Sequence, residues 1–123
     1  MWVTFHDARI DGLFAGTRWR LVAANGRSIA VSSDWFADRA QALAALGTVC
    51  REVGRFTVQT THAGSSVQWA WTAVDTDGVA MAAGDRVFAR YGTCVSAYNR
   101  FVATARELGG QDLRELIRPT AGR

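Results

Sequence analysis

Two segments of the chain carry nearly the same pattern of residues, and this repetition limits the folds that the chain can adopt. The first is RWRLVAANGRSIA, residues 18–30, and the second is QWAWTAVDTDGVA, residues 68–80. At an offset of 50 residues (69 − 19 = 50), Trp19 corresponds to Trp69 and Ile29 to Val79. After the third strand of each half we expect an offset of 52, which implies a two-residue insertion near Asp85.

Each half has the periodicity of three strands followed by one helix. In the second half, apolar and polar residues alternate over Arg55–Thr61 and Val67–Ala73, which predicts two strands, and Val79–Ala83 is expected to be a third. In the first half, Trp2–Asp7 supplies the first strand and residues 10–16, IDGLFAG, are expected to form a longer loop. Asn25-Gly26 predicts a tight hairpin turn.

Two helices are predicted because apolar residues recur every three or four positions. Asp38 and Gln41 form a capping box at the start of the first helix, and Gly54 ends it. The buried stripes are expected to be Leu43, Leu46, Val49, Cys50 and Val53 in the first helix, and Cys94, Tyr98, Phe101, Ala105 and Leu108 in the second.

The ends of the second half are less regular than those of the first. Arg90 stands where Asp38 caps the first helix, so we expect the second helix to begin near Thr93. Asp112 and Glu115 have capping-box spacing and predict a final short helix at Leu113–Arg118, which Pro119 closes.

The predicted fold class is α+β. One three-stranded unit with one helix buries too little apolar surface to be stable alone, whereas two units can share a sheet and a core. We expect two tandem β-β-β-α repeats that form one antiparallel sheet with helices packed on one face, plus a short C-terminal helix. The single domain 1–123 comprises repeat one at 1–54, repeat two at 55–108 and a C-terminal extension at 109–123. A pseudo-dimer within one chain is expected to be a monomer.

The first half resembles the repeat of the YegP-like proteins. It has RWRLVAANG, then the aromatic Phe36, then ADRAQALAALGTV, in which Leu46 and Val49 take the places of the family's Ile/Val pair. The similarity is close over residues 18–49 and looser over 67–101, where VDTDG replaces AANG. The resemblance implies one antiparallel sheet from two β-rich repeats, with terminal strands exchanged between repeats or subunits and helices on one side. It implies no enzymatic activity.

Charge and length narrow the classes of function. The net charge is +3, and the chain contains fourteen arginines and no lysine. This basic charge is compatible with an acidic partner. No apolar run reaches the roughly 20 residues that a membrane span needs, so no membrane association is expected. The N-terminal MWVTFHDARIDG is not expected to be a signal peptide, and we expect a cytoplasmic protein with reduced thiols.

The sequence predicts no catalytic, metal-binding or cofactor-binding residue. His6 and His62 have no partner at metal-ligand spacing, and a pairing of His62 with Ser65 or Ser66 lacks any nucleophile motif. DTDG at residues 75–78 is interpreted as a hairpin turn rather than a calcium loop. Cys50 and Cys94 are expected to be buried free thiols on the helix stripes.

One group of residues carries a functional hypothesis. Arg18 and Arg20 alternate with Trp19 and Leu21, so they are expected on the sheet face opposite the helices, with Arg27 nearby beyond the turn. Such a face is either an ordinary solvated surface or a partner-binding surface. We favour a small non-catalytic interaction or structural module with a protein partner. The alternative is an RNA- or nucleoprotein-associated factor that binds through the same arginines.

Overall fold

The computed structural model describes residues 1–64 and 67–118. The strands are β1 (Trp2–Ile10), β2 (Leu13–Val22), β3 (Ser28–Ser32), β4 (Thr57–His62), β5 (Trp69–Val74) and β6 (Ala80–Ala83). The helices are α1 (Arg39–Glu52) and α2 (Tyr91–Leu108), and two short 3-10 turns are η1 (Val53–Arg55) and η2 (Leu113–Leu116). The order of three strands and a helix occurs twice, as the sequence predicts.

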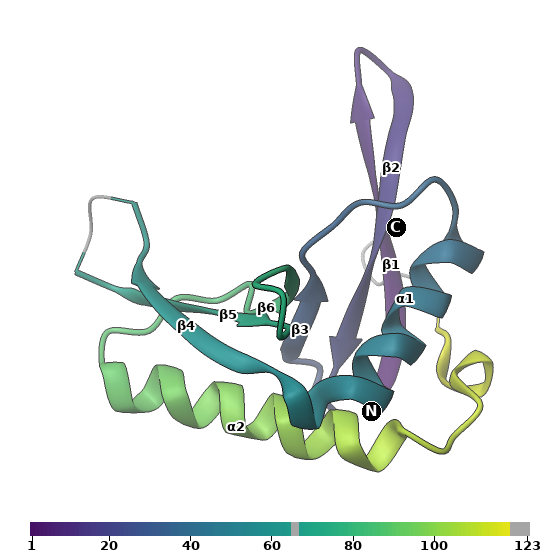
Figure 1. Ribbon diagram of the computed structural model, residues 1–123. Helices are drawn as coiled ribbons and strands as arrows, with labels where there is room; N and C mark the ends of the chain where they lie inside the picture. The colour runs from purple at the N-terminus through teal and green to yellow at the C-terminus, as the bar shows by residue number, and fades with distance from the viewer. Residues whose placement is uncertain (65–66, 119–123) are drawn as a thin grey trace.

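All six strands form one antiparallel sheet in the order β1-β2-β3-β6-β5-β4 (Figure 1). The halves meet through β3 and β6, which pair Val31 with Ala83 and Ser32 with Ala82. The family resemblance implies that terminal strands are exchanged between repeats or subunits. Within the described part of the chain each half keeps its own three strands together, so the two repeats exchange no strand. The predicted α+β class with a single antiparallel sheet is confirmed.

A constant offset of 52 residues relates the two halves from β2 to α2. Arg20 pairs with Val31 as Thr72 pairs with Ala83, and each pair of strands has a register shift two residues later (72 − 20 = 52). Trp19 therefore corresponds to Trp71. The sequence alignment of Trp19 with Trp69 at an offset of 50 is wrong, and so is the predicted insertion near Asp85.

The two turns explain why residue type alone led to the wrong register. Trp69 and Trp71 are alternate residues of β5, so both fit the same side of the strand. The backbone distinguishes them, because Gly26 N donates to Ala23 O just as Gly78 N donates to Asp75 O. Asn25-Gly26 thus corresponds to Asp77-Gly78, and the register of each sheet half follows from its turn.

The predicted loop at residues 10–16 is also wrong, because β1 and β2 join through a two-residue turn at Asp11-Gly12. Both residues have positive φ, 53° and 79°, which the twist-compatible hairpin turns require. The resulting hairpin extends beyond the rest of the sheet (Figure 1). Its apolar residues Ile10 and Leu13 are both exposed. The usual strand pattern, in which apolar residues are buried and polar residues are exposed, therefore does not hold at the end of this hairpin.

Both helices pack against one face of the sheet and share one core with it (Figure 1). The stripe predicted for α2 is buried at all of its positions: Cys94, Tyr98, Phe101, Ala105 and Leu108. In the first half, Leu46, Val49, Cys50 and Val53 are buried and Leu43 is partly buried. Trp19 and Trp71 are buried on the facing strands, and Trp69 packs against the edge of the core.

The two main helices begin at equivalent positions but are capped differently. The Asp38 carboxylate accepts a hydrogen bond of 2.8 Å from Gln41 N, as predicted. α2 begins at Tyr91, earlier than the predicted Thr93, although its N-cap residue Arg90 makes no side-chain capping bond. Packing of the α2 stripe on the core therefore sustains the first turn without a cap.

The C-terminal helix predicted at Leu113–Arg118 is shorter than expected. Asp112 accepts a hydrogen bond from Arg114 N and starts the 3-10 turn η2. The chain then becomes extended, because Ile117 bridges Val3 in parallel and Arg118 N donates to Val3 O at 2.8 Å. Pro119 lies outside the described residues.

Candidate functional site

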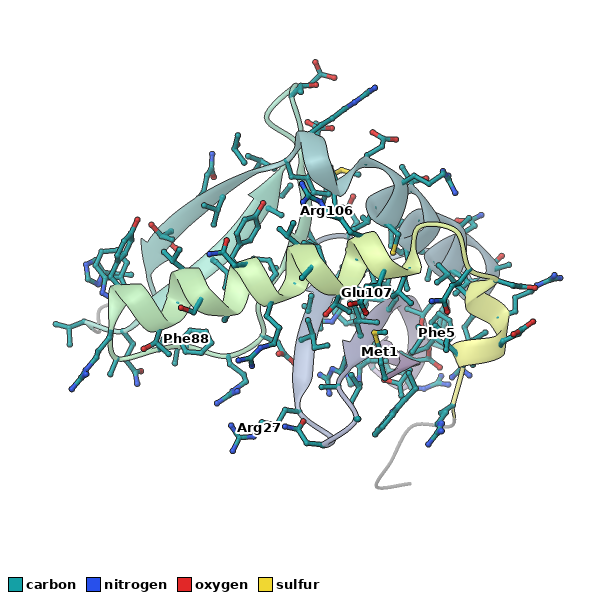
Figure 2. The ribbon with its side chains drawn as sticks, turned by 90° about the horizontal axis from the view of Figure 1, so that it is seen from below. Met1, Phe5, Arg27, Phe88, Arg106 and Glu107 are labelled. Carbon is teal, nitrogen blue, oxygen red and sulfur yellow. The ribbon has the colours of Figure 1, made fainter. Side chains whose placement is uncertain are left out.

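A pocket forms where the two halves of the sheet separate. Beyond Ala83 the chain leaves β3 and follows β5, where Gly84 N donates to Trp71 O and Phe88 exchanges backbone hydrogen bonds with Trp69. The space left between the β2–β3 turn, the β6–α2 segment and the first half of α2 is a pocket of about 280 Å³. Figure 2 shows Arg27 on the turn at one side and Phe88 beside α2.

Three arginines from distant parts of the chain line this pocket, which we call the arginine pocket: Arg27, Arg86 and Arg100. All three side chains are exposed, and the Arg86 guanidinium lies over the Phe88 ring, 5.6 Å from its centroid. Among residues 1–64 and 67–118, none of these three arginines forms an ion pair. Asp85 also lines the pocket, but its carboxylate is paired with Arg20.

A smaller pocket of about 190 Å³ occupies the equivalent place in the first half, and we call it the counterpart pocket. At the offset of 52, its Trp19, Phe36 and Ala45 correspond to Trp71, Phe88 and Ala97 of the arginine pocket. The charged positions differ, because Asp34 stands in place of Arg86 and Thr48 in place of Arg100. The same architecture is therefore cationic in one half and acidic in the other.

Arg18 and Arg20 lie on the sheet face opposite the helices, because they alternate with the buried Trp19 and Leu21. The guanidinium of Arg18 lies over the ring of Trp35, 4.7 Å from its centroid, and Trp35 is 43 % exposed. Arg20 Nη2 lies 3.3 Å from Asp85 Oδ2. We call the surface formed by His6, Arg18, Arg20 and Trp35 the arginine face.

Electrostatics on the arginine face are set by burial and by these neighbours. Burial lowers the pKa of Arg18, the adjacent Arg20 lowers it further, and Asp85 opposes the shift. The guanidinium of Arg18 stays charged at neutral pH, because the ordinary pKa of arginine lies far above it. The Nε–H groups of Arg18 and Arg20 are buried without an acceptor in the described part of the chain.

The structure brings Arg18 and Arg20 together but places Arg27 with a different group of residues. Arg27 lines the arginine pocket beside Arg86 and Arg100, neither of which is among the sequence-predicted site residues. At the offset of 52, Arg86 stands in place of the acidic Asp34 and Arg100 in place of the neutral Thr48. This difference between the two halves is the signal in the sequence that could have pointed to them.

The thiols and histidines form no reactive group within residues 1–64 and 67–118. Cys50 and Cys94 are buried free thiols, as predicted. Burial raises the pKa of Cys50 to about 11, with Arg51 opposing the shift, and burial also raises the pKa of Cys94. The ring of His62 lies against that of Trp69 in a tilted arrangement with centroids 4.1 Å apart, while Ser65 and Ser66 lie outside the described residues.

Residues 1–64 and 67–118 provide neither a cluster of metal ligands nor a membrane-spanning helix. They contain no group of three or more His, Cys, Asp or Glu residues that could hold a metal ion. None of their helices has both the length and the apolarity that crossing a bilayer requires.

Two solved structures are similar to this chain over nearly its whole length. One is YegP from E. coli, a protein of unknown function, with a TM-score of 0.60, 14 % identity, and coverage of 99 % of this chain and 94 % of YegP. The other is a UPF0339 protein from Shewanella oneidensis, with a TM-score of 0.62, 10 % identity, and coverage of 96 % and 89 %. No protein-family profile and no curated protein matches the chain. This chain has the fold of YegP, which confirms at the level of the fold the resemblance found in its sequence.

Proposed function

We propose that this protein is a small non-catalytic interaction module that binds a protein partner through the arginine face. The observation that supports the proposal is the stack of Arg18 on Trp35. A guanidinium held against a ring loses little side-chain freedom on binding, and its planar fork can still donate hydrogen bonds to a carboxylate.

The charge of the arginine face favours a protein over nucleic acid. Asp85 offsets one of the two arginines, so these three groups carry a net charge of +1. Nucleic-acid backbones are usually held by several phosphate contacts, whereas one free guanidinium beside a half-exposed aromatic ring fits a carboxylate next to an apolar residue. The alternative, an RNA- or nucleoprotein-associated factor, is supported by the ability of Trp35 and Arg18 to stack on an unpaired base.

The test compares a double variant, Arg18→Ala with Arg20→Ala, with a matched control, Arg51→Ala with Arg55→Ala, which also loses two exposed or half-exposed arginines. Tagged proteins are purified from the native host, and the amount of each co-purified protein is measured relative to wild type. We expect at least a tenfold loss of one specific partner in the first variant and retention in the control. Retention of every partner by the first variant would rule out the arginine face.

A salt titration separates the two partner classes. Binding of single-stranded RNA is followed by fluorescence anisotropy for the wild type and for the double variant. For an RNA-binding face, the slope of log affinity against log salt falls by roughly 0.7 for each lost phosphate contact. Equal, weak RNA binding by both proteins supports the protein partner instead.

We further propose that the chain acts as a cytoplasmic monomer, with repeats at 1–54 and 55–108 and an extension at 109–123. Supporting this, the constant offset of 52 relates strand pairing in the two halves, and β3 and β6 join them within one chain. Light scattering coupled to size-exclusion chromatography should give the mass of one chain, 13.4 kDa. A mass of twice that value at micromolar concentration would contradict the proposal.

A further inference from the structure

The arginine pocket and the counterpart pocket offer a comparison within one molecule. Arg27, Arg86 and Arg100 with Asp85 give the arginine pocket a formal charge of +2, and Asp34 gives the counterpart pocket −1. The fold does not require arginine at positions 86 and 100, because the counterpart pocket has Asp34 and Thr48 at the corresponding places. The arginines therefore need an explanation other than the packing of the repeat.

Three arginines around one pocket create a positive potential there, which attracts an anion. The carboxylate in the pocket, Asp85, is engaged by Arg20 from the other side of the sheet. Among residues 1–64 and 67–118, Arg27, Arg86 and Arg100 have no other acidic partner. An anion that enters the pocket can supply the missing charge.

The rest of the lining describes the other part of the ligand. The partly buried Phe88 gives the pocket an aromatic wall, with Ile29 and Ala97 as further apolar lining, and Trp71 borders the pocket but is 1 % exposed. Thr93 and Ser96 of α2 add hydroxyl groups. A volume of about 280 Å³ lies just below the range for small-molecule sites, which run from about 300 to 1,000 Å³, so the ligand must be small.

We propose that the arginine pocket binds a small phosphate monoester that carries a planar, apolar ring. The phosphate is a dianion at neutral pH, and guanidinium groups bind phosphate oxygens in pairs of parallel hydrogen bonds. The ring packs against Phe88, Ile29 and Ala97. This small-molecule site is distinct from the arginine face, since none of its three arginines belongs to that face.

The experiment titrates the full-length, nitrogen-15-labelled protein with phenyl phosphate and with adenosine monophosphate, followed by NMR and calorimetry. Phenol and adenosine serve as uncharged controls. We expect saturable binding of at least one phosphate ester, with the largest shifts at the Trp71 indole N–H and the Ala97 amide, and little change at the Trp19 indole. Affinity for the matching uncharged control should be at least about tenfold weaker. Absence of saturable binding by both esters would overturn the proposal.

The decisive variant gives the arginine pocket the residues of its counterpart, Arg86→Asp with Arg100→Thr. These residues occupy the same positions of the same architecture in the first half, so the fold is expected to accept them. The control, Arg55→Asp with Arg9→Thr, makes the same change in charge outside the pocket. We expect at least a tenfold loss of affinity in the pocket variant and less than a twofold change in the control. Equal losses in both would show that only the overall charge matters and would overturn the site.

Discussion

Gly84 lies so close to the indole ring of Trp71 that a β-carbon on Gly84 would be 2.6 Å from Nε1 of that ring. Trp71 is buried and stacks on Phe101 with ring centroids 5.2 Å apart, so a displacement of its ring would disturb the core. The absence of a side chain at Gly84 therefore lets β6 leave the sheet next to Trp71. That departure opens the arginine pocket.

Gly84→Ala should consequently destabilise the protein. The clash requires a shift of the Trp71 ring or of the backbone, and overpacking of this kind costs about 1–3 kcal/mol in the free energy of unfolding. Urea denaturation measures the loss. Gly92→Ala is the matched control, since a β-carbon there meets nothing within 4 Å, and alanine in α2 should stabilise by about 0.5–1 kcal/mol. Equal stability of Gly84→Ala and wild type would contradict the close approach.

The missing cap of α2 can be supplied. Arg90 occupies the N-cap position in extended backbone, as Asp38 does in α1, but makes no side-chain capping bond. Arg90→Asp should accept a hydrogen bond from Thr93 N and raise the free energy of unfolding by about 0.5–2 kcal/mol. Asp38→Ala should lower it by a similar amount. Thermal and urea unfolding of both variants provide the check, and a destabilised Arg90→Asp would show that α2 begins differently from α1.

Asp85 pairs with Arg20 of the arginine face and also lines the arginine pocket. Its replacement should have different effects on the free energy of unfolding and on the affinity for a phosphate ester. Its ion pair with Arg20 is partly exposed, with side-chain exposures of 18 % and 38 %, so Asp85→Asn should cost only about 0.2–1 kcal/mol, less at high salt. The same change removes the negative charge from the pocket lining. Phenyl phosphate should then bind more tightly, and weaker binding measured by calorimetry would mean that Asp85 positions the ligand.

The buried thiols should react slowly in the native protein. Cys50 and Cys94 are 4 % and 0 % exposed, and burial disfavours the reactive thiolate in both. A chromogenic thiol reagent should label neither at pH 8 until urea unfolds the chain, after which both should react. Rapid labelling of one thiol without urea would show that its helix opens locally.

Stability should fall as the pH rises above 9. The pKa of Cys50 is about 11 in the folded state and near 9.0 when unperturbed, so the unfolded chain loses its proton first. For Cys50 alone this removes about 1 kcal/mol of unfolding free energy between pH 8 and pH 10. The raised pKa values of Cys94 and Tyr98 act in the same direction.

The control is Cys50→Val, because valine is the residue at the corresponding position 102 (102 − 50 = 52). Urea titrations at pH 8, 9 and 10 should show a smaller loss of stability for this variant than for wild type. An unchanged slope would mean that Cys50 does not ionise differently in the two states.

Local patterns in the sequence determined the two main helices, most of the strands and most of the core. Helical spacing identified the whole stripe from Cys94 to Leu108, and Asp38 with Gln41 located the start of α1. These predictions succeed because each depends on residues within a few turns of one element. Alternation around Trp19 and Leu21 likewise placed Arg18 and Arg20 on the opposite side of β2.

Only the tertiary structure decided the strand register and the arginine pocket. A strand has a period of two, so Trp69 and Trp71 were equivalent partners for Trp19 until the hydrogen bonds of the turns selected one. Arg27 and Arg100 are far apart along the chain, and they line one pocket because β3 pairs with β6 and α2 packs across the junction. No local pattern contains that pairing, since its free energy comes from the core that the two halves build together.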